Sequence, residues 1–394
     1  MPEQYDAIVV GAGPAGASAA YLLARAGHKV ALVDKTSFPR DKLCGGGLTV
    51  RSKKAFERIF STQWNDIIEF KSAGLAFYYK KKFLNSLENY QSLHFIYRCD
   101  FDHYLVKKAQ DAGAELIENF RISEIDSQNH VIHENSGRQL QADFIIGADG
   151  IKSVVARQVF GQEFDRNKYA IAMETEVSRD QFKRHVTLPE IYYGSIQWGY
   201  GWVFPKKDKL TIGIAGLYKH NNDIKSVFHK FLEQDLGLPT NLPMKGYYLP
   251  FGEFQQQLEK NNFMLIGDAA GLVDPITGEG IAFAMESGEM AAESIIKALQ
   301  QAQPQIAGKL YQLRVERITN TIRQANKIKL LIYPKFFNKI LIKGLATSTN
   351  KNSIRYYLDL MADDITYYQY LKLLFWHSGK RVIKLMFTRD ALEN

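Results

Sequence analysis

The sequence predicts a mixed α/β fold with three parts. Three glycine-bearing segments, at residues 11–16, 147–150 and 267–271, each adjoin a short apolar run. Such runs are typical of buried parallel strands that end in a nucleotide-binding turn. Residues 169–217 are strand-rich and aromatic, and residues 301–394 have a mostly helical pattern. We therefore expect a Rossmann-like dinucleotide-binding domain, an interleaved antiparallel-sheet domain for the substrate, and a helical C-terminal region.

The expected domains alternate along the chain. At 394 residues the chain is too long for one ordinary core, which favours two closely joined domains. The dinucleotide-binding domain is expected over residues 1–70, 99–165 and 260–300, the substrate domain over 71–98 and 166–259, and the helical region over 301–394.

Composition narrows the class of protein. Apolar residues make up 46% of the chain and charged residues 23%, as in a soluble globular protein. No apolar run reaches the ~18 residues of a membrane span and no secretory signal is recognisable, so we expect a cytoplasmic protein. Cys44 and Cys99 are too few for a disulfide framework or an iron–sulfur cluster. The net charge of +8 favours contact with an anionic surface, but without a zinc spacing or a nucleic-acid motif we expect no metal and no nucleic acid.

The first glycine segment fits a βαβ unit that binds a pyrophosphate. Residues 6–10 are an apolar, β-branched run, as in a buried parallel strand. Gly11 lets the chain turn, Gly13 lets the backbone approach a pyrophosphate, and Gly16 lets the next helix pack on the strand. Asp34 ends the second strand, where an acidic side chain accepts hydrogen bonds from an adenosine ribose. A βαβ unit that binds nothing is the alternative. The three glycine segments together suit one long dinucleotide, which we expect to be FAD.

The other elements follow in order along the chain. They are a loop at residues 35–52, strands at 74–98, a helix at 102–112, a strand and a β-meander at 115–146, a sheet at 169–217, a buried strand at 262–266 and a long helix at 280–299.

Two fingerprints resemble those of the aromatic-hydroxylase class of FAD enzymes. Residues 149–157 resemble the central fingerprint, and residues 267–280 resemble the ribityl-binding fingerprint. The resemblance implies that Asp268 accepts hydrogen bonds from the ribityl chain, and that the next helix directs its N-terminus at the flavin. Arg98 followed by Asp102 resembles the contact near the pyrophosphate in that class.

Two further segments resemble the geranylgeranyl reductase family. They are residues 42–47, Lys-Leu-Cys-Gly-Gly-Gly, and residues 200–205, Tyr-Gly-Trp-Val-Phe-Pro. That family reduces isolated double bonds of isoprenoid chains in archaeal-type membrane lipids, chlorophyll side chains or quinones. The resemblance covers about residues 5–300. The family's aromatic motif often begins with a proline where this chain has Gln197, a departure that bears on the identity of the lipid.

The residues and the resemblance together give the expected cofactor site. It consists of Gly11, Gly13, Ala15, Gly16, Asp34, Lys35, Arg40, Cys44, Gly45, Gly46, Gly47, Arg98, Asp149, Gly267, Asp268, Gly278, Gly280 and Ile281.

The aromatic stretch suits an apolar substrate. In an alternating strand Tyr200, Trp202 and Phe204 share one face, which would line a tunnel for a prenyl chain. Together with Tyr193 and Trp198 they are the expected substrate-binding residues. Plain core packing is the alternative explanation for an aromatic strand.

The expected reaction is reduction of a double bond in a geranylgeranyl or polyprenyl lipid. Reduced FAD would give a hydride and a nearby acid a proton, with Cys44 and Tyr200 as the expected catalytic residues. The resemblance implies that the Cys44 loop borders the flavin ring. Cys44 would donate the proton or orient the chain, and a small apolar filler is the alternative. NAD(P)H or a ferredoxin-like carrier would supply electrons.

Two other functions stay open on the sequence. The same FAD fingerprints occur in monooxygenases that hydroxylate aromatic or quinone-type substrates. Halogenases of this class use a Trp-x-Trp-x-Ile-Pro strand, from which Tyr200 and Phe204 depart. A non-catalytic lipid or FAD carrier is the third interpretation.

Residues 327–343 are expected to contact a membrane surface. They mix aliphatic and aromatic residues with five lysines, a composition typical of an interfacial segment on anionic headgroups. We therefore expect peripheral contact with the inner face of the membrane. Pro334 argues against one continuous helix, and a helix packed on the protein is the alternative.

Overall fold

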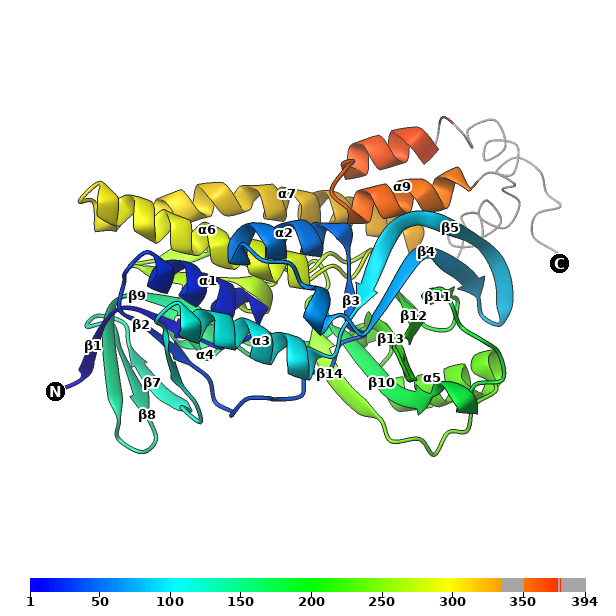
Figure 1. The fold of residues 1–394 in the computed structure, drawn as a ribbon, viewed down its shortest axis with the longest axis horizontal. Coiled ribbons are helices and arrows are strands. Elements are labelled where there is room, and N and C mark those ends of the chain that lie inside the picture. Colours follow the sequence, from blue (N-terminus) through cyan, green and yellow to red (C-terminus); the bar gives the residue numbers. More distant parts are fainter. Residues whose placement is uncertain (335–350, 375, 377–394) are drawn as a thin grey trace.

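The computed structural model describes residues 1–334, 351–374 and 376, and within them two large sheets lie side by side under a layer of helices (Figure 1). The first sheet has the strand order β15-β16-β9-β1-β2-β6, with β8 also paired to β9 and β7 to β8. Its strands are β1 Glu3–Val10, β2 Val30–Val33, β6 Glu115–Ile117, β7 Ile122–Asp126, β8 Val131–Glu134, β9 Gln139–Gly147, β15 Glu259–Lys260 and β16 Phe263–Leu265.

The second sheet has the order β14-β10-β13-β12-β11-β4-β5-β3. Its strands are β3 Gly47–Leu48, β4 Phe70–Tyr79, β5 Lys82–Phe95, β10 Ala170–Ser178, β11 Glu190–Tyr193, β12 Gly199–Pro205, β13 Lys209–Leu217 and β14 Lys245–Leu249. All of its pairings except β11 with β4 are antiparallel.

Helices cover the sheets and form the C-terminal part of the described chain. They are α1 Pro14–Arg25, α2 Val50–Phe60, α3 Arg98–Asp111, α4 Val154–Phe160, α5 Ile224–Lys230, α6 Ile281–Gln300, α7 Ala307–Ile332 and α9 Asn352–Met361. Short helical turns occur at Asn65–Ile67, Arg166–Lys168, Arg179–Gln181, Tyr218–His220, Phe231–Leu236, Gly267–Ala270 and Pro304–Ile306. The predicted mixed α/β class, with a Rossmann-like first part and a helical C-terminal part, is confirmed.

The central strands of the first sheet pair in parallel, as their continuous apolar runs predict. β1 pairs in parallel with β2 and β9, and β9 pairs in parallel with β16. Ile8 and Val9 are fully buried, and α1 and α6 pack closely together over them. A Cβ atom added at Gly288 of α6 would lie 2.3 Å from the Ala15 carbonyl oxygen, so only glycine permits this approach. The approach brings the N-termini of two helices to one end of the sheet.

Some element boundaries differ from those expected. The helix expected at residues 102–112 begins at Arg98, one turn earlier. The strands expected at 74–98 form a hairpin of β4 and β5 that begins at Phe70. The long helix expected at 280–299 spans Ile281–Gln300.

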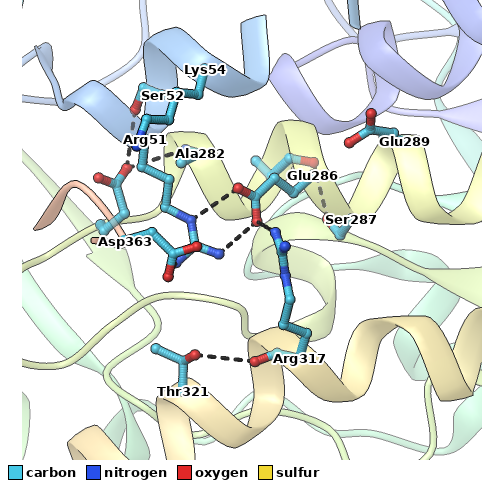
Figure 2. Close-up of polar contacts among 12 residues, drawn as sticks. Arg51, Ser52, Lys54, Ala282, Glu286, Ser287, Glu289, Arg317, Thr321 and Asp363 are labelled. Atoms are coloured by element: carbon cyan, nitrogen blue, oxygen red, sulfur yellow. Dashed lines mark hydrogen bonds and ion pairs between the residues drawn. The ribbon is translucent and has the colours of Figure 1, made fainter. Parts of the chain in front are cut away.

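An ion-pair network centred on the buried pair Arg51–Glu286 fastens the C-terminal helices to the rest of the protein (Figure 2). The Arg51 guanidinium of α2 donates two hydrogen bonds to Glu286 of α6, at 2.9 and 2.7 Å. Arg317 of α7 lies 3.2 Å from the same carboxylate, and Arg51 also lies 3.2 Å from Asp363, just after α9. Burial by itself raises the pKa of Glu286, but the hydrogen bonds and positive charges of Arg51 and Arg317 together outweigh burial and lower it. Helices α2, α6 and α7 therefore meet at the Glu286 carboxylate, and Arg51 links the segment after α9 to them.

Candidate active site

A cavity of about 800 Å³ is lined by residues from both sheets. Volumes of this size hold a ligand with most of its surface buried. The lining brings together most of the residues expected from the sequence. These are Gly11, Gly13, Ala15, Asp34, Lys35, Arg40, Cys44, Gly45, Gly46, Gly47, Arg98, Asp149, Tyr200, Trp202, Phe204, Asp268, Gly278, Gly280 and Ile281.

The first glycine turn lies directly against the second. Gly11 has φ +102°, and a Cβ atom there would fall 2.4 Å from the Ala148 carbonyl oxygen. The Ala12 N–H donates to one oxygen of Asp34 at 2.9 Å, which orients that carboxylate. The N-terminus of α1 lines the cavity and no side chain caps it, so its backbone dipole favours an anion there.

The side chain of Asp149 is tied to its own turn. Its carboxylate accepts hydrogen bonds from the Ser153 hydroxyl at 2.5 Å and from the Val154 N–H at 2.6 Å. Burial raises its pKa, and these bonds oppose that rise. Asp149 therefore supports the N-terminus of α4, whose N-cap residue is Ser153. The turn that carries Asp149 lines the cavity.

Two arginines share one buried carboxylate beside the first turn. Arg98 donates two hydrogen bonds to Asp102, at 2.7 and 2.8 Å, and Arg40 lies 3.3 Å from the same carboxylate. Burial alone would lower the pKa of Arg98, but Asp102 outweighs it and raises that pKa. The network fixes two cations at the wall of the cavity.

The triple glycine lets the Cys44 loop lie on the aromatic strand. A Cβ atom at Gly45 would lie 2.8 Å from the Phe204 ring, and one at Gly46, with φ +72°, would lie 2.2 Å from the Ile96 carbonyl oxygen. The Gly46 N–H donates to the Cys44 sulfur at 3.4 Å. The Cys44 N–H donates to a carboxylate oxygen of Glu174 at 3.1 Å. The loop is thus held from two sides.

The aromatic face of β12 forms the apolar wall of the cavity. Tyr200, Trp202 and Phe204 all line it, as their shared face predicts. The Tyr200 hydroxyl donates to the Thr277 carbonyl oxygen at 3.1 Å. Burial raises the pKa of Tyr200. Its proton is therefore both held by a hydrogen bond and hard to release.

Four of the expected residues lie outside the lining. Tyr193 stacks on Phe77 in a buried aromatic cluster, and Trp198 stacks on His220. Gly16 and Gly267 instead allow the backbone to pack closely. A Cβ atom at Gly16 would lie 1.9 Å from the Gly11 carbonyl oxygen. A Cβ atom at Gly267 would lie 2.9 Å from the Ala15 Cβ.

Several residues in or beside the site were not among the site residues expected from the sequence. Tyr357 and Met361 of α9 line the cavity although they lie far along the chain. Lys42 lies over the Tyr247 ring at 4.4 Å, and burial lowers its pKa. Glu174, on β10, belongs to no recognisable motif. Its connection with the site becomes visible only in the folded chain, where it accepts a hydrogen bond from Cys44.

The residues present fit FAD. Glycine turns without side chains, an uncapped helix N-terminus and the Arg40–Arg98 pair suit a pyrophosphate, while the Asp34 carboxylate suits a ribose. Asp268 and the start of α6 at Gly280 line the same cavity further along. One cavity thus offers the donor and acceptor types that a long dinucleotide requires.

Comparisons with known proteins agree with this site. A family model described as an FAD binding domain matches residues 4–187. Menaquinone reductase of Mycobacterium tuberculosis is 30% identical over 318 residues, which cover 74% of this chain and 77% of that protein. The chloroplastic geranylgeranyl diphosphate reductase of Nicotiana tabacum is 30% identical over 314 residues, covering 73% of this chain and 65% of that protein.

A solved structure shares the whole fold. The geranylgeranyl bacteriochlorophyll reductase-like protein of Thermoplasma acidophilum superposes with a TM-score of 0.76 at 23% identity, covering all of both chains. Fold and site together define an FAD-dependent oxidoreductase. With the identity and coverage above, the chain belongs to the family of these enzymes that includes menaquinone reductase and the geranylgeranyl reductases.

Proposed function

We propose that this protein reduces isolated carbon–carbon double bonds of a geranylgeranyl or polyprenyl lipid. The observation that carries the proposal is the contact between the Cys44–glycine loop and the aromatic face of β12, inside the cavity that the nucleotide-binding turns also line. The names of two relatives, menaquinone reductase and geranylgeranyl diphosphate reductase, support a reductase with an isoprenoid substrate.

The chain's own residues bind the cofactor and position the lipid. The turn at Gly11, the Arg40–Arg98 pair and Asp268 would hold FAD, which when bound and reduced supplies the hydride. Leu75, Leu93 and Ile191 extend the apolar wall of the cavity beyond β12. Such a wall excludes water and holds an isolated alkene, a poor hydride acceptor, in one orientation.

The Cys44 thiol is the proposed proton donor. As one alkene carbon accepts the hydride, the S–H bond breaks and its proton forms a C–H bond at the other carbon, which leaves a thiolate. Tyr200 is the second candidate, but its hydroxyl is already bonded to Thr277 and its pKa is raised.

Anaerobic turnover tests the proposal. The FAD-loaded protein is reduced chemically and incubated with geranylgeranyl diphosphate, a geranylgeranylated phospholipid and menaquinone, and the products are read by mass spectrometry. Two added hydrogens per double bond are expected, and both are deuterium in deuterated water, because the N–H of chemically reduced flavin and the S–H of the thiol both take their hydrogen from the solvent. The Cys44→Ala protein, loaded with FAD to the same level, is the control. No added hydrogen in any lipid would sink the proposal, and an oxygen-containing product under air would favour the monooxygenase alternative.

We also propose peripheral contact with a membrane and an electron donor of the NAD(P)H or ferredoxin-like type. Leu330 and Leu331, near the end of α7, are exposed, whereas Ile328 is buried and Lys329 donates to the Phe251 carbonyl oxygen. Residues 335–343 of the expected interfacial segment lie outside the described residues. No helix in the described ranges is long and apolar enough to cross a bilayer.

Liposomes and a donor panel test these two proposals. Serine substitution of the two exposed leucines is expected to lower co-sedimentation with anionic liposomes, and substitution of exposed Leu313 on the same helix is the control. Equal sedimentation of all variants argues against membrane contact at the end of α7. Flavin bleaching under argon with NADH, NADPH or reduced ferredoxin identifies the donor.

A further inference from the structure

Three buried polar atoms gather on one face of the second sheet without a hydrogen-bond partner in the described part of the chain. They are Oε2 of Glu174, Nε1 of Trp202 and Oγ1 of Thr211. Buried polar atoms in folded proteins are nearly always paired, so a cluster of unpaired ones requires an explanation. A bound water or a catalytic role is the usual one.

The pairing of the strands places these three side chains together. Gly213 of β13 lies opposite both Glu174 of β10 and Trp202 of β12, so the three positions share a face. Thr211 stands two residues before Gly213 on the same face. A Cβ atom at Gly213 would lie 2.2 Å from the Trp202 ring, so the indole leans over the glycine, toward the row of Glu174.

This polar cluster lies directly behind the Cys44 loop. Oε1 of Glu174 accepts a hydrogen bond from the Cys44 N–H at 3.1 Å. A Cβ atom at Gly45 would lie 3.1 Å from Nε1 of Trp202. Cys44 and Trp202 line the cavity, whereas Glu174 and Thr211 do not. Glu174 and Thr211 therefore lie behind the cavity wall, and Glu174 contacts the residue that has to regain a proton.

The Glu174 carboxyl is suited to hold a proton near neutral pH. Its side chain is buried, and burial raises its pKa to about 7. The hydrogen bond from Cys44 and the charge of Lys206 act in the opposite direction and limit this rise. The other charged groups that face this region are Asp41 on the loop, Glu176 on the same strand, and Lys245 on β14, which pairs with Asp41. Arg98 and Lys42, together with Lys206, are cations that interact with the Cys44 side chain.

We propose that Glu174 is the proton reservoir of the Cys44 thiol. A water molecule bound by Glu174, Trp202 and Thr211 carries the proton from the Glu174 carboxyl to the Cys44 sulfur. This inference rests on the proposed function of Cys44. After a turnover, the O–H bond of the Glu174 carboxyl breaks, its proton passes through the water, and an S–H bond forms at the Cys44 thiolate. The carboxylate left behind takes a proton from solvent before the next turnover. No electron is transferred in this step.

Glu174→Gln is the variant that tests the reservoir. The amide keeps the shape and an oxygen that accepts the Cys44 N–H, but it does not titrate. Glu176→Gln is the matched control, since Glu176 lies on the same strand and face but is half exposed beside Lys206 and Lys209. Flavin absorbance and circular dichroism first establish that both variants fold and bind FAD.

The first measurement needs no substrate. The rate of Cys44 alkylation by iodoacetamide is followed from pH 5.5 to 9.5 in the FAD-loaded protein, with modification located by peptide mass spectrometry. In the wild type and Glu176→Gln, ionisation of the neighbouring carboxyl is expected to add an inflection near the pKa of about 7 given above. In Glu174→Gln that inflection is expected to vanish. The alkylation measurement tests the link between Glu174 and Cys44 even if the wild type reduces no lipid. That outcome would refute only the proposed function.

The second measurement is lipid reduction by the same proteins across the same pH range. Glu174→Gln is expected to lose about 10²-fold in turnover at pH 6.5, the lower end of the contribution of a positioned acid or base. Glu176→Gln is expected to keep the wild-type rate. An unchanged pH profile in Glu174→Gln, in either measurement, overturns the proposal. If Glu174→Gln does not fold, Thr211→Val removes one partner of the water, and the alkylation inflection must then move to higher pH.

Discussion

Replacing Arg51 by methionine should destabilise the protein strongly, because it leaves the buried Glu286 carboxylate without its main partner. Both side chains are buried, at 5% and 2% exposure, and Arg51 donates two short hydrogen bonds to Glu286. Removing one partner of such a pair costs about 3–5 kcal/mol. Arg317 still reaches Glu286 at 3.2 Å, so we expect the lower end, about 3 kcal/mol.

Equilibrium urea unfolding with FAD in excess measures this loss. Lys53→Met is the control on the same helix, because Lys53 pairs with Glu57 at 3.7 Å on the surface, where a pair contributes about 0–1 kcal/mol. The double variant Arg51→Met/Glu286→Gln should be less destabilised than the sum of its single changes, since neither buried charge is then left alone.

Strict additivity in that cycle, or a cost of Arg51→Met below about 1 kcal/mol, would refute the reasoning about a buried pair. The sign of the pH dependence is a further check. The pKa of Glu286 is lowered in the folded protein, so the stability it contributes is present above its ordinary value of 4.5 and is lost as the pH falls through its folded value. The difference between the wild type and Arg51→Met should therefore shrink below about pH 4.5.

The remaining predictions concern the cavity. Asp268→Ala should weaken FAD binding by about 1–3 kcal/mol, because a ribityl acceptor is lost and donors stay unpaired; fluorescence titration measures it, and wild-type affinity contradicts it. Cys44→Ser should lower lipid reduction and Cys44→Ala should lower it further, with flavin occupancy near wild type in both; a wild-type rate in the alanine variant would make Cys44 structural. Glu174→Gln should stabilise the protein by about 3 kcal/mol at pH 8 and about 1 kcal/mol at pH 5, because a pKa raised from 4.5 to about 7 makes ionisation of the buried carboxyl cost stability as the pH rises. Equal urea midpoints for both proteins at pH 8 would contradict that expectation.

The sequence by itself determined the parts of the site that depend on local backbone geometry. Gly11 is readable because a tight turn after a buried strand requires glycine there, and Gly13 is readable because its spacing suits a backbone that approaches a pyrophosphate. Asp34 is readable because it ends the next strand. The alternation of β12 likewise predicted that Tyr200, Trp202 and Phe204 share a face, and all three line the cavity.

Only the tertiary structure decided what lies opposite those segments. Trp198 and Tyr193 are aromatic like their neighbours, but neither lines the cavity. Trp198 lies in the turn before β12 and stacks on His220. Tyr193, on β11, packs in a buried aromatic cluster with Phe77. Tyr357 reaches the cavity because α9 folds back over the second sheet, a contact that no local pattern encodes.

Glu174 shows the physical reason most clearly. In the sequence it is one acid on an alternating strand, and an acid there is ordinarily a solvated side chain. The folded chain buries it beneath Cys44, 130 residues away, and burial, not residue type, raises its pKa. Local conformation follows from neighbouring residues and is legible in the sequence, whereas burial and electrostatic environment depend on distant segments and exist only once the sheets have assembled.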